Sequence, residues 1–204
     1  MNFSAACVII IYGEVINRGK SEYDYIKNII RRNYFMCGIV GYVGQRDCTD
    51  VLMQGLEKLE YRGYDSAGIA VFEKTGIKTV KTKGKLADMR HKLDIEGSPV
   101  GHCGIGHTRW ATHGEPSDIN SHPHTNGRVT IVHNGIIENY IELKEFLTEK
   151  GYTFTSQTDT EVVACLLDYY YSERNPLRAI TETLKELKGS YALGIIFRDF
   201  PDRV

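Results

Sequence analysis

The sequence predicts an α+β fold built on antiparallel sheet. Short strand-like runs come first in the patterned part of the chain, and helical periodicity dominates afterwards. The gaps between neighbouring strand-like runs are as short as hairpin connections, which favours antiparallel pairing. With 204 residues and 42% hydrophobic content, the chain can bury the core of one domain or slightly more.

The expected elements follow from the spacing of apolar residues. Apolar runs bounded by glycine and polar residues predict strands at 38–43, 67–72, 77–81, 101–107, 129–133 and 191–197. The first strand is expected to be buried, and the second and third to pair as a hairpin. Apolar residues three or four apart predict helices at 47–60, 86–93, 139–150, 160–171 and 177–187.

Thr158 and Glu161 form the pattern of a helix capping box. Thr158 is expected to cap the helix, and the side chain of Glu161 to reach back to the Thr158 backbone N–H. Asp159 would then stand in the first helical turn, with its carboxylate free for the ammonium group of a ligand.

The composition argues against several classes of partner. A net charge of −1 provides no basic surface for nucleic acid or an anionic membrane. The longest apolar run, residues 5–12, is far shorter than the roughly 20 residues of a membrane helix and lacks the basic start of a secretory signal. The five cysteines are odd in number and include no C-x-x-C pair, which favours a reducing cytoplasm. We therefore expect a cytoplasmic protein with neither nucleic acid nor membrane as partner.

Met36 followed by Cys37 resembles the start of a protein, although 35 residues precede the pair. If Met36 is the initiator and is removed, Cys37 carries a thiol and a free α-amine. Their pKa values, about 8.5 and about 7.7–8, allow proton exchange near neutral pH, so the amine can activate the thiol as a nucleophile. Residues 1–35 have three possible interpretations. They are a leader translated from a start codon placed too far upstream, which we favour, or a cleaved propeptide, or an authentic extension. Residues 36–204 are the expected domain.

Three polar motifs have both a structural and a chemical interpretation. Asn134-Gly135 after a strand favours a tight turn, but the Asn134 amide and the Gly135 N–H could also both donate to an oxyanion. Arg109, expected in a loop beside Trp110, is suited to bind a carboxylate bidentately or to stack on the indole. Arg62, in the string R-G-Y-D, favours a structural turn.

A metal site and a nucleotide site are weaker alternatives. Six of the seven histidines fall between residues 102 and 133, and His122-Pro123-His124 is the best candidate pair of metal ligands. The proline favours a turn, however, and no carboxylate or H-x-x-x-H spacing supports a metal, so none is expected. The glycines do not match G-x-G-x-x-G, which makes a nucleotide site unlikely.

Taken together and in order, five strings closely resemble the glutaminase domain of the glutamine–fructose-6-phosphate aminotransferase (isomerizing) family. They are M-C-G-I-V-G at 36–41, Y-R-G-Y-D-S-A-G at 61–68, H-T-R-W-A-T-H-G at 107–114, V-H-N-G-I-I-E-N at 132–139 and T-D-T-E-V at 158–162. The resemblance runs from Met36 to near Val204. It implies a class II glutamine amidotransferase with an N-terminal-nucleophile fold, a four-layer αββα sandwich of two antiparallel sheets.

The resemblance also implies roles for matching residues. Cys37, once first in the chain, would attack the side-chain amide of L-glutamine, and Asn134 and Gly135 would hold the oxyanion. Arg109 would bind the α-carboxylate of glutamine and Asp159 its α-ammonium group. The resemblance implies no metal or organic cofactor.

Further positions carry weaker implications. Trp110, Thr112 and His113 would lie on the loop that closes over glutamine, and Arg62 would lie near the nucleophile. The ammonia would pass to an isomerase region that carries the fructose 6-phosphate site and is absent here, and the resemblance leaves a homodimer open. We also expect the chain to stop before the domain is complete. Because Cys37 is not first as written, a non-catalytic glutamine-binding or assembly module is the alternative.

Overall fold

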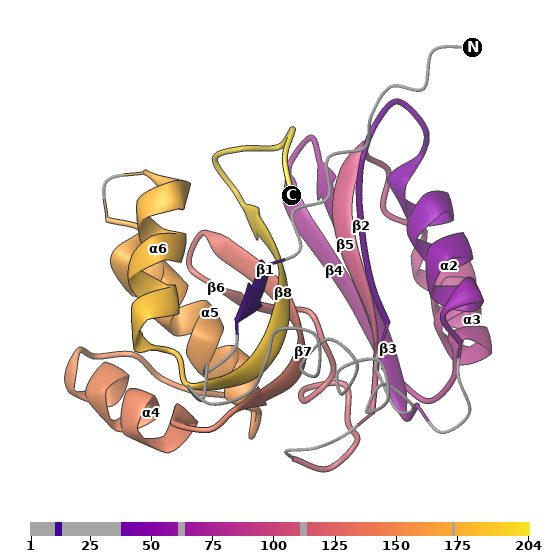
Figure 1. Ribbon diagram of the computed structural model, residues 1–204. Helices are drawn as coiled ribbons and strands as arrows, with labels where there is room; N and C mark the ends of the chain where they lie inside the picture. The colour runs from indigo at the N-terminus through magenta and orange to yellow at the C-terminus, as the bar shows by residue number, and fades with distance from the viewer. Residues whose placement is uncertain (1–10, 14–37, 61–63, 111–113, 173) are drawn as a thin grey trace, which may run out of the picture.

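The computed structural model describes residues 11–13, 38–60, 64–110, 114–172 and 174–204. Figure 1 shows four layers, with a helical layer on the outer side of each of two packed sheets. One helical layer contains α2 (Cys48–Lys58) and α3 (Leu86–Glu96), and the other contains α4 (Tyr140–Glu149), α5 (Asp159–Tyr170) and α6 (Pro176–Glu186). This arrangement agrees with the predicted α+β class and with the αββα sandwich that the family resemblance implies.

The first sheet has the strand order β2-β5-β3-β4, formed by β2 (Gly38–Val43), β5 (Cys103–Arg109), β3 (Ser66–Glu73) and β4 (Gly76–Lys83). All of its pairings are antiparallel, and β3 and β4 form the predicted hairpin. Leu52, Leu56 and Met89 from the covering helices are almost inaccessible to solvent. The prediction that β2 is buried is wrong, because β2 is an edge strand and only Gly38 in it is buried.

The second sheet has the strand order β1-β8-β7-β6, formed by β1 (Ile11–Gly13), β8 (Gly189–Phe197), β7 (Val129–Ile137) and β6 (His124–Asn126). Neither β1 nor β6 was predicted from the sequence. β1 comes from the expected leader and pairs with β8, so part of residues 1–35 contributes to the sheet. β6 falls where His122-Pro123-His124 favoured only a turn, and it is too short for a period to be recognised.

The two sheets pack through a small apolar core. Ile105 of β5, Val132 of β7 and Ile196 of β8 are all fully buried in it. Burying such a side chain stabilises the fold by about 1.5–3 kcal/mol. These contacts hold β5 against β7, and this pairing positions the polar residues at the ends of both strands.

The start of α5 is capped by a variant of the predicted box. The Thr158 hydroxyl accepts from the Glu161 backbone N–H at 3.3 Å, as expected. The Glu161 carboxylate, however, accepts from the backbone N–H groups of Thr155 and Ser156, at 2.9 and 2.7 Å, rather than from that of Thr158. Although burial opposes the shift, these hydrogen bonds lower the pKa of Glu161. The helix start is therefore joined to the preceding segment by a charged group.

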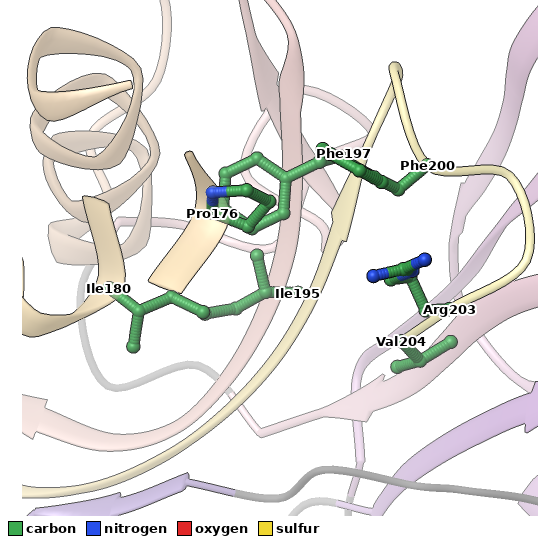
Figure 2. A pocket seen from close by; sticks show the side chains of 7 residues that line it. All are labelled: Pro176, Ile180, Ile195, Phe197, Phe200, Arg203 and Val204. Carbon is green, nitrogen blue, oxygen red and sulfur yellow. The ribbon is translucent and has the colours of Figure 1, made fainter. Parts of the chain in front are cut away.

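A small apolar cavity of about 90 Å³ lies between α6, β8 and the end of the chain. Figure 2 shows the side chains that line it. Its lining residues are Pro176, Ile180, Ile195, Phe197, Phe200, Arg203 and Val204. A second cavity of about 610 Å³ has a mixed polar lining that includes Lys81, Asp118, His124 and Glu161.

Candidate active site

Asn134 and Gly135 lie inside β7 and do not form a turn. β7 pairs with β8 along its whole length, with Asn134 opposite Ala192 and Gly135 opposite Tyr191. Gly135 has a φ of +113°, and a Cβ placed on it would lie 2.1 Å from the backbone oxygen of Ser190. The tight-turn interpretation is therefore wrong: this glycine allows left-handed backbone and close approach to β8 within a continuous strand.

The Asn134 side chain reaches across to the other sheet. Its Oδ1 lies 2.7 Å from Nε2 of His107, which is fully buried near the end of β5. Burial lowers the pKa of His107 to about 3, against the opposing effect of the hydrogen bond with Asn134. The imidazole is therefore neutral at physiological pH.

The end of β5 also meets the beginning of β2. Gly38, which follows Cys37 in the sequence, is paired with Thr108, and its N–H donates to the Thr108 hydroxyl at 3.1 Å. A Cβ at Gly38 would lie 2.8 Å from Cβ of Leu59, so the absence of a side chain allows this close packing.

Arg109 is the last residue of β5 and is 4% exposed. Its predicted place in a loop is therefore wrong. One terminal nitrogen of the guanidinium donates to the Gly114 carbonyl at 3.4 Å, and the Arg109 carbonyl accepts from the Asp65 N–H at 2.9 Å. Trp110 follows and is 43% exposed.

Asp159 lies at the first position of α5 and is 4% exposed. Its Oδ2 accepts from the backbone N–H of Ile137 at 3.0 Å, two residues beyond Gly135 in β7. Its Oδ1 lies 3.4 Å from the Thr160 hydroxyl and 3.8 Å from Nδ1 of His133. The same contacts fix Asp159 against the strand that carries Asn134.

A network of buried histidines and threonines continues behind these residues. The Thr160 hydroxyl lies 3.0 Å from Nδ1 of His133 and 3.0 Å from Nε2 of His122. The His122 ring in turn lies 4.3 Å, centroid to centroid, from the ring of His107. Nε2 of His124 lies 3.1 Å from the Thr158 hydroxyl. Burial lowers the pKa of both His122 and His124 well below its usual range.

The candidate pair of metal ligands thus has threonine hydroxyls as its partners. Among the residues that the structure describes, no group of three or more His, Cys, Asp or Glu is arranged to hold a metal ion. In the same part of the chain, no helix is both long and apolar enough to cross a membrane.

The sequence-predicted residues fall into three groups. The structure brings Asn134, Gly135 and Asp159 together on β7 and the start of α5, and His107 links Asn134 to the strand that ends at Arg109. Trp110 follows directly on Arg109. The remaining members, Cys37, Arg62, Thr112 and His113, lie outside the described residues.

Two residues of the site were not singled out from the sequence. His107 was considered only within the histidine-rich stretch and the string at 107–114, and Thr160 only within the predicted helix and the string at 158–162. Each lies within two residues of a residue that was predicted to bind glutamine, and this was the only sign of them in the sequence. Only the tertiary contacts show which groups they bind.

The glutamine amidotransferase domain family matches residues 107–201 of this chain. Glutamine–fructose-6-phosphate aminotransferases [isomerizing] from Clostridium tetani and Clostridium perfringens are 56% and 59% identical to it over 171 residues, which is 83% of this chain and 28% of each relative. Among solved structures, the glutamine phosphoribosylpyrophosphate amidotransferase from B. subtilis is 27% identical with a TM-score of 0.66, covering 80% of this chain and 35% of that one.

The fold, the buried polar site and these matches define a glutamine amidotransferase domain of the N-terminal-nucleophile type. Within that class, the chain belongs to the glutamine–fructose-6-phosphate aminotransferase [isomerizing] family. It spans about 28% of the length of the curated relatives that it matches.

Proposed function

We propose that this chain hydrolyses the side-chain amide of L-glutamine to glutamate and ammonia through a thioester on Cys37. In the whole protein, the ammonia would serve the synthesis of glucosamine 6-phosphate from fructose 6-phosphate. The proposal assigns Cys37, Asn134 and Gly135 to catalysis.

One observation carries the proposal: three separate segments converge at one end of the two sheets. β2 begins at Gly38 beside Thr108, β5 contacts β7 through His107 and Asn134, and α5 contacts β7 through Asp159. The nucleophile precedes the first segment, and the candidate oxyanion donors and ammonium ligand lie in the others. Such convergence on rigid elements provides the orientation that acyl transfer requires.

The chemistry needs no external cofactor. The α-amine of an N-terminal Cys37 takes the thiol proton, and the sulfur attacks the carboxamide carbon. Donors from Asn134 and Gly135 stabilise the resulting oxyanion, where one such donor contributes about 10²–10³ in rate. The C–N bond then breaks, and the ammonium of Cys37 returns its proton to the leaving ammonia. Water next attacks the thioester, releasing glutamate and regenerating the thiol.

Recognition of the amino acid requires opposite charges at fixed positions. Arg109 would bind the α-carboxylate of glutamine and Asp159 the α-ammonium group, and both residues are 4% exposed. Charge-assisted hydrogen bonds in such a buried setting are stronger than those in water. Trp110, Thr112 and His113 would cover the bound glutamine, and Arg62 would lie near the nucleophile.

The proposal also divides the chain and places it in a larger protein. Residues 1–35 would be a leader and residues 36–204 the amidotransferase domain. An isomerase region that binds fructose 6-phosphate would be its partner, homodimerisation is left open, and the reaction would occur in the cytoplasm. The three cysteines in the described part of the chain are free and buried, which supports a reducing compartment.

The test compares glutamate release by two forms of the chain, one beginning at Met1 and one at Cys37, with intact mass confirming each start. We expect turnover from the form beginning at Cys37, because only it has the α-amine. Cys37→Ala should abolish turnover, and Cys165→Ala, a matched change at a buried cysteine of α5, should not. Glutamate release by the Cys37→Ala variant, or none from the form beginning at Cys37, would contradict the proposal.

A further inference from the structure

We propose that His107 is a positioning residue for Asn134: its Nε2–H holds the carboxamide oxygen, so that the amide NH₂ group is presented to the oxyanion. This inference rests on the proposed function and adds a residue to which neither the sequence motifs nor the comparisons give a role. It concerns how the oxyanion donor is aimed.

The contact places the oxygen end of the Asn134 amide against His107. Nε2 of His107 and Oδ1 of Asn134 are 2.7 Å apart, which is a short hydrogen bond for this pair of atoms. A carboxamide has an acceptor at one end and two N–H donors at the other. When the acceptor end is bound to β5, the donor end points away from His107. Asn134 is partly exposed, whereas His107 is 1% exposed, so the contact lies on the buried side of the amide.

The ring nitrogen of His107 that carries the proton determines whether His107 can hold Asn134 in this orientation. A neutral imidazole has one N–H, and a donor to Oδ1 must carry it on Nε2. Nδ1 of His107 is buried, and no hydrogen bond to it is found in the described part of the chain. A backbone group of His133 does interact with the ring and favours its protonation, although burial outweighs this effect. The cation Arg109 lies two residues further along β5, and its charge and that of His133 on β7 both disfavour a charged imidazolium.

The other tautomer would reverse the sign of the interaction. With the proton on Nδ1, Nε2 becomes an acceptor, and the amide must turn its NH₂ group towards His107. The amide oxygen would then face the developing oxyanion, and a stabilising contact would become a repulsive one. The ring is also held from behind by His122, at 4.3 Å between centroids, which limits its reorientation. His107 therefore selects the productive orientation of Asn134.

The kinetic test uses the form of the chain that hydrolyses glutamine. His107→Leu removes the donor and should lower kcat by about 10- to 100-fold, with little change in KM, because the oxyanion exists only after attack. His107→Gln offers an N–H at a similar reach and should recover much of the loss. Thr183→Val is the control, since Thr183 is a buried polar residue of α6 outside the site, and it should retain kcat.

Two measurements separate positioning from general damage. In an Asn134→Ala background, His107→Leu should have no further effect on kcat, because its target is gone. Multiplicative losses in this double-mutant cycle would overturn the inference. Nitrogen-15 NMR of the full chain should find the His107 proton on Nε2, and a proton on Nδ1 would also overturn it.

Failure of this inference is distinguishable from failure of the proposed function. An active wild type whose kcat is unaffected by His107→Leu refutes the role of His107 and leaves glutamine hydrolysis intact. An inactive wild type, in the forms beginning at both Met1 and Cys37, refutes the function and any catalytic role of His107 with it.

Discussion

Mild acid should destabilise this domain steeply, because it buries neutral imidazoles. His107, His122 and His124 are each 5% exposed or less. Burial keeps their pKa values below the ordinary 6.5, with His107 at about 3. Unfolding releases each ring into water, where it takes up a proton below about pH 6.5. Stability is therefore fully present above pH 6.5 and is lost as the pH falls below it.

The size of the effect follows from proton linkage. Between about pH 7.5 and pH 5.5, each such histidine lowers the free energy of unfolding by about 1.4 kcal/mol, so three lower it by about 4 kcal/mol. This is a large fraction of the roughly 5–15 kcal/mol that typically stabilises a domain. The pKa of Glu161 is lowered below its ordinary 4.5, so its contribution is lost only at still lower pH and does not obscure this window.

The assay is urea unfolding at several pH values between about 7.5 and 5.5. The slope of the unfolding free energy against pH reports how many protons the chain takes up on unfolding. This number should approach three in the wild type and about two in His124→Gln. Thr183→Val, which removes a buried hydroxyl but no titrating group, should change the stability without changing the slope. A free energy of unfolding that stays constant over this range would refute the reasoning.

Three local substitutions, one of them with a matched control, have distinct expected effects. Gly135→Ala should cost more than the roughly 1–3 kcal/mol of left-handed strain, because its Cβ would also meet the Ser190 carbonyl, and should reduce glutamine hydrolysis. Gly76 has a φ of +132°, and a Cβ added there would have nothing within 4 Å, so Gly76→Ala should show the backbone strain alone. Equal losses of unfolding free energy in urea for the two glycine variants would contradict the close approach of Gly135 to Ser190. Thr158→Ala should destabilise by about 1 kcal/mol through loss of the α5 cap, and an unchanged thermal midpoint would count against it. Glu161→Gln should destabilise at pH 7 and lose the stability change near pH 4, whereas a persisting change would mean that another group titrates there.

Much of the architecture could be predicted because its signals are local. The apolar period of α5 and the threonine before it placed that helix to within one residue at each end. The hairpin of β3 and β4 followed from two apolar runs with a short connection. Cap chemistry and period act over one or two turns of backbone, so they are readable without knowledge of the fold. The motifs that resemble the family are also short continuous strings, so they and their order can be recognised without knowledge of the fold.

The orientation of the site was decided by tertiary structure. An Asn-Gly pair is compatible with a hairpin turn, and only pairing with β8 and the Ser190 carbonyl make it part of a continuous strand. The first helical turn of α5 places Asp159, but its contact with the Ile137 N–H of β7 could not be predicted from the sequence. The histidine-rich stretch could have suggested a metal, but folding gives two of its rings threonine partners and gives His107 the oxygen of Asn134. The sequence determined which chemical groups are present and which elements carry them. Their hydrogen-bond partners come from segments distant in sequence, so only the packing of the two sheets decided which way each group points.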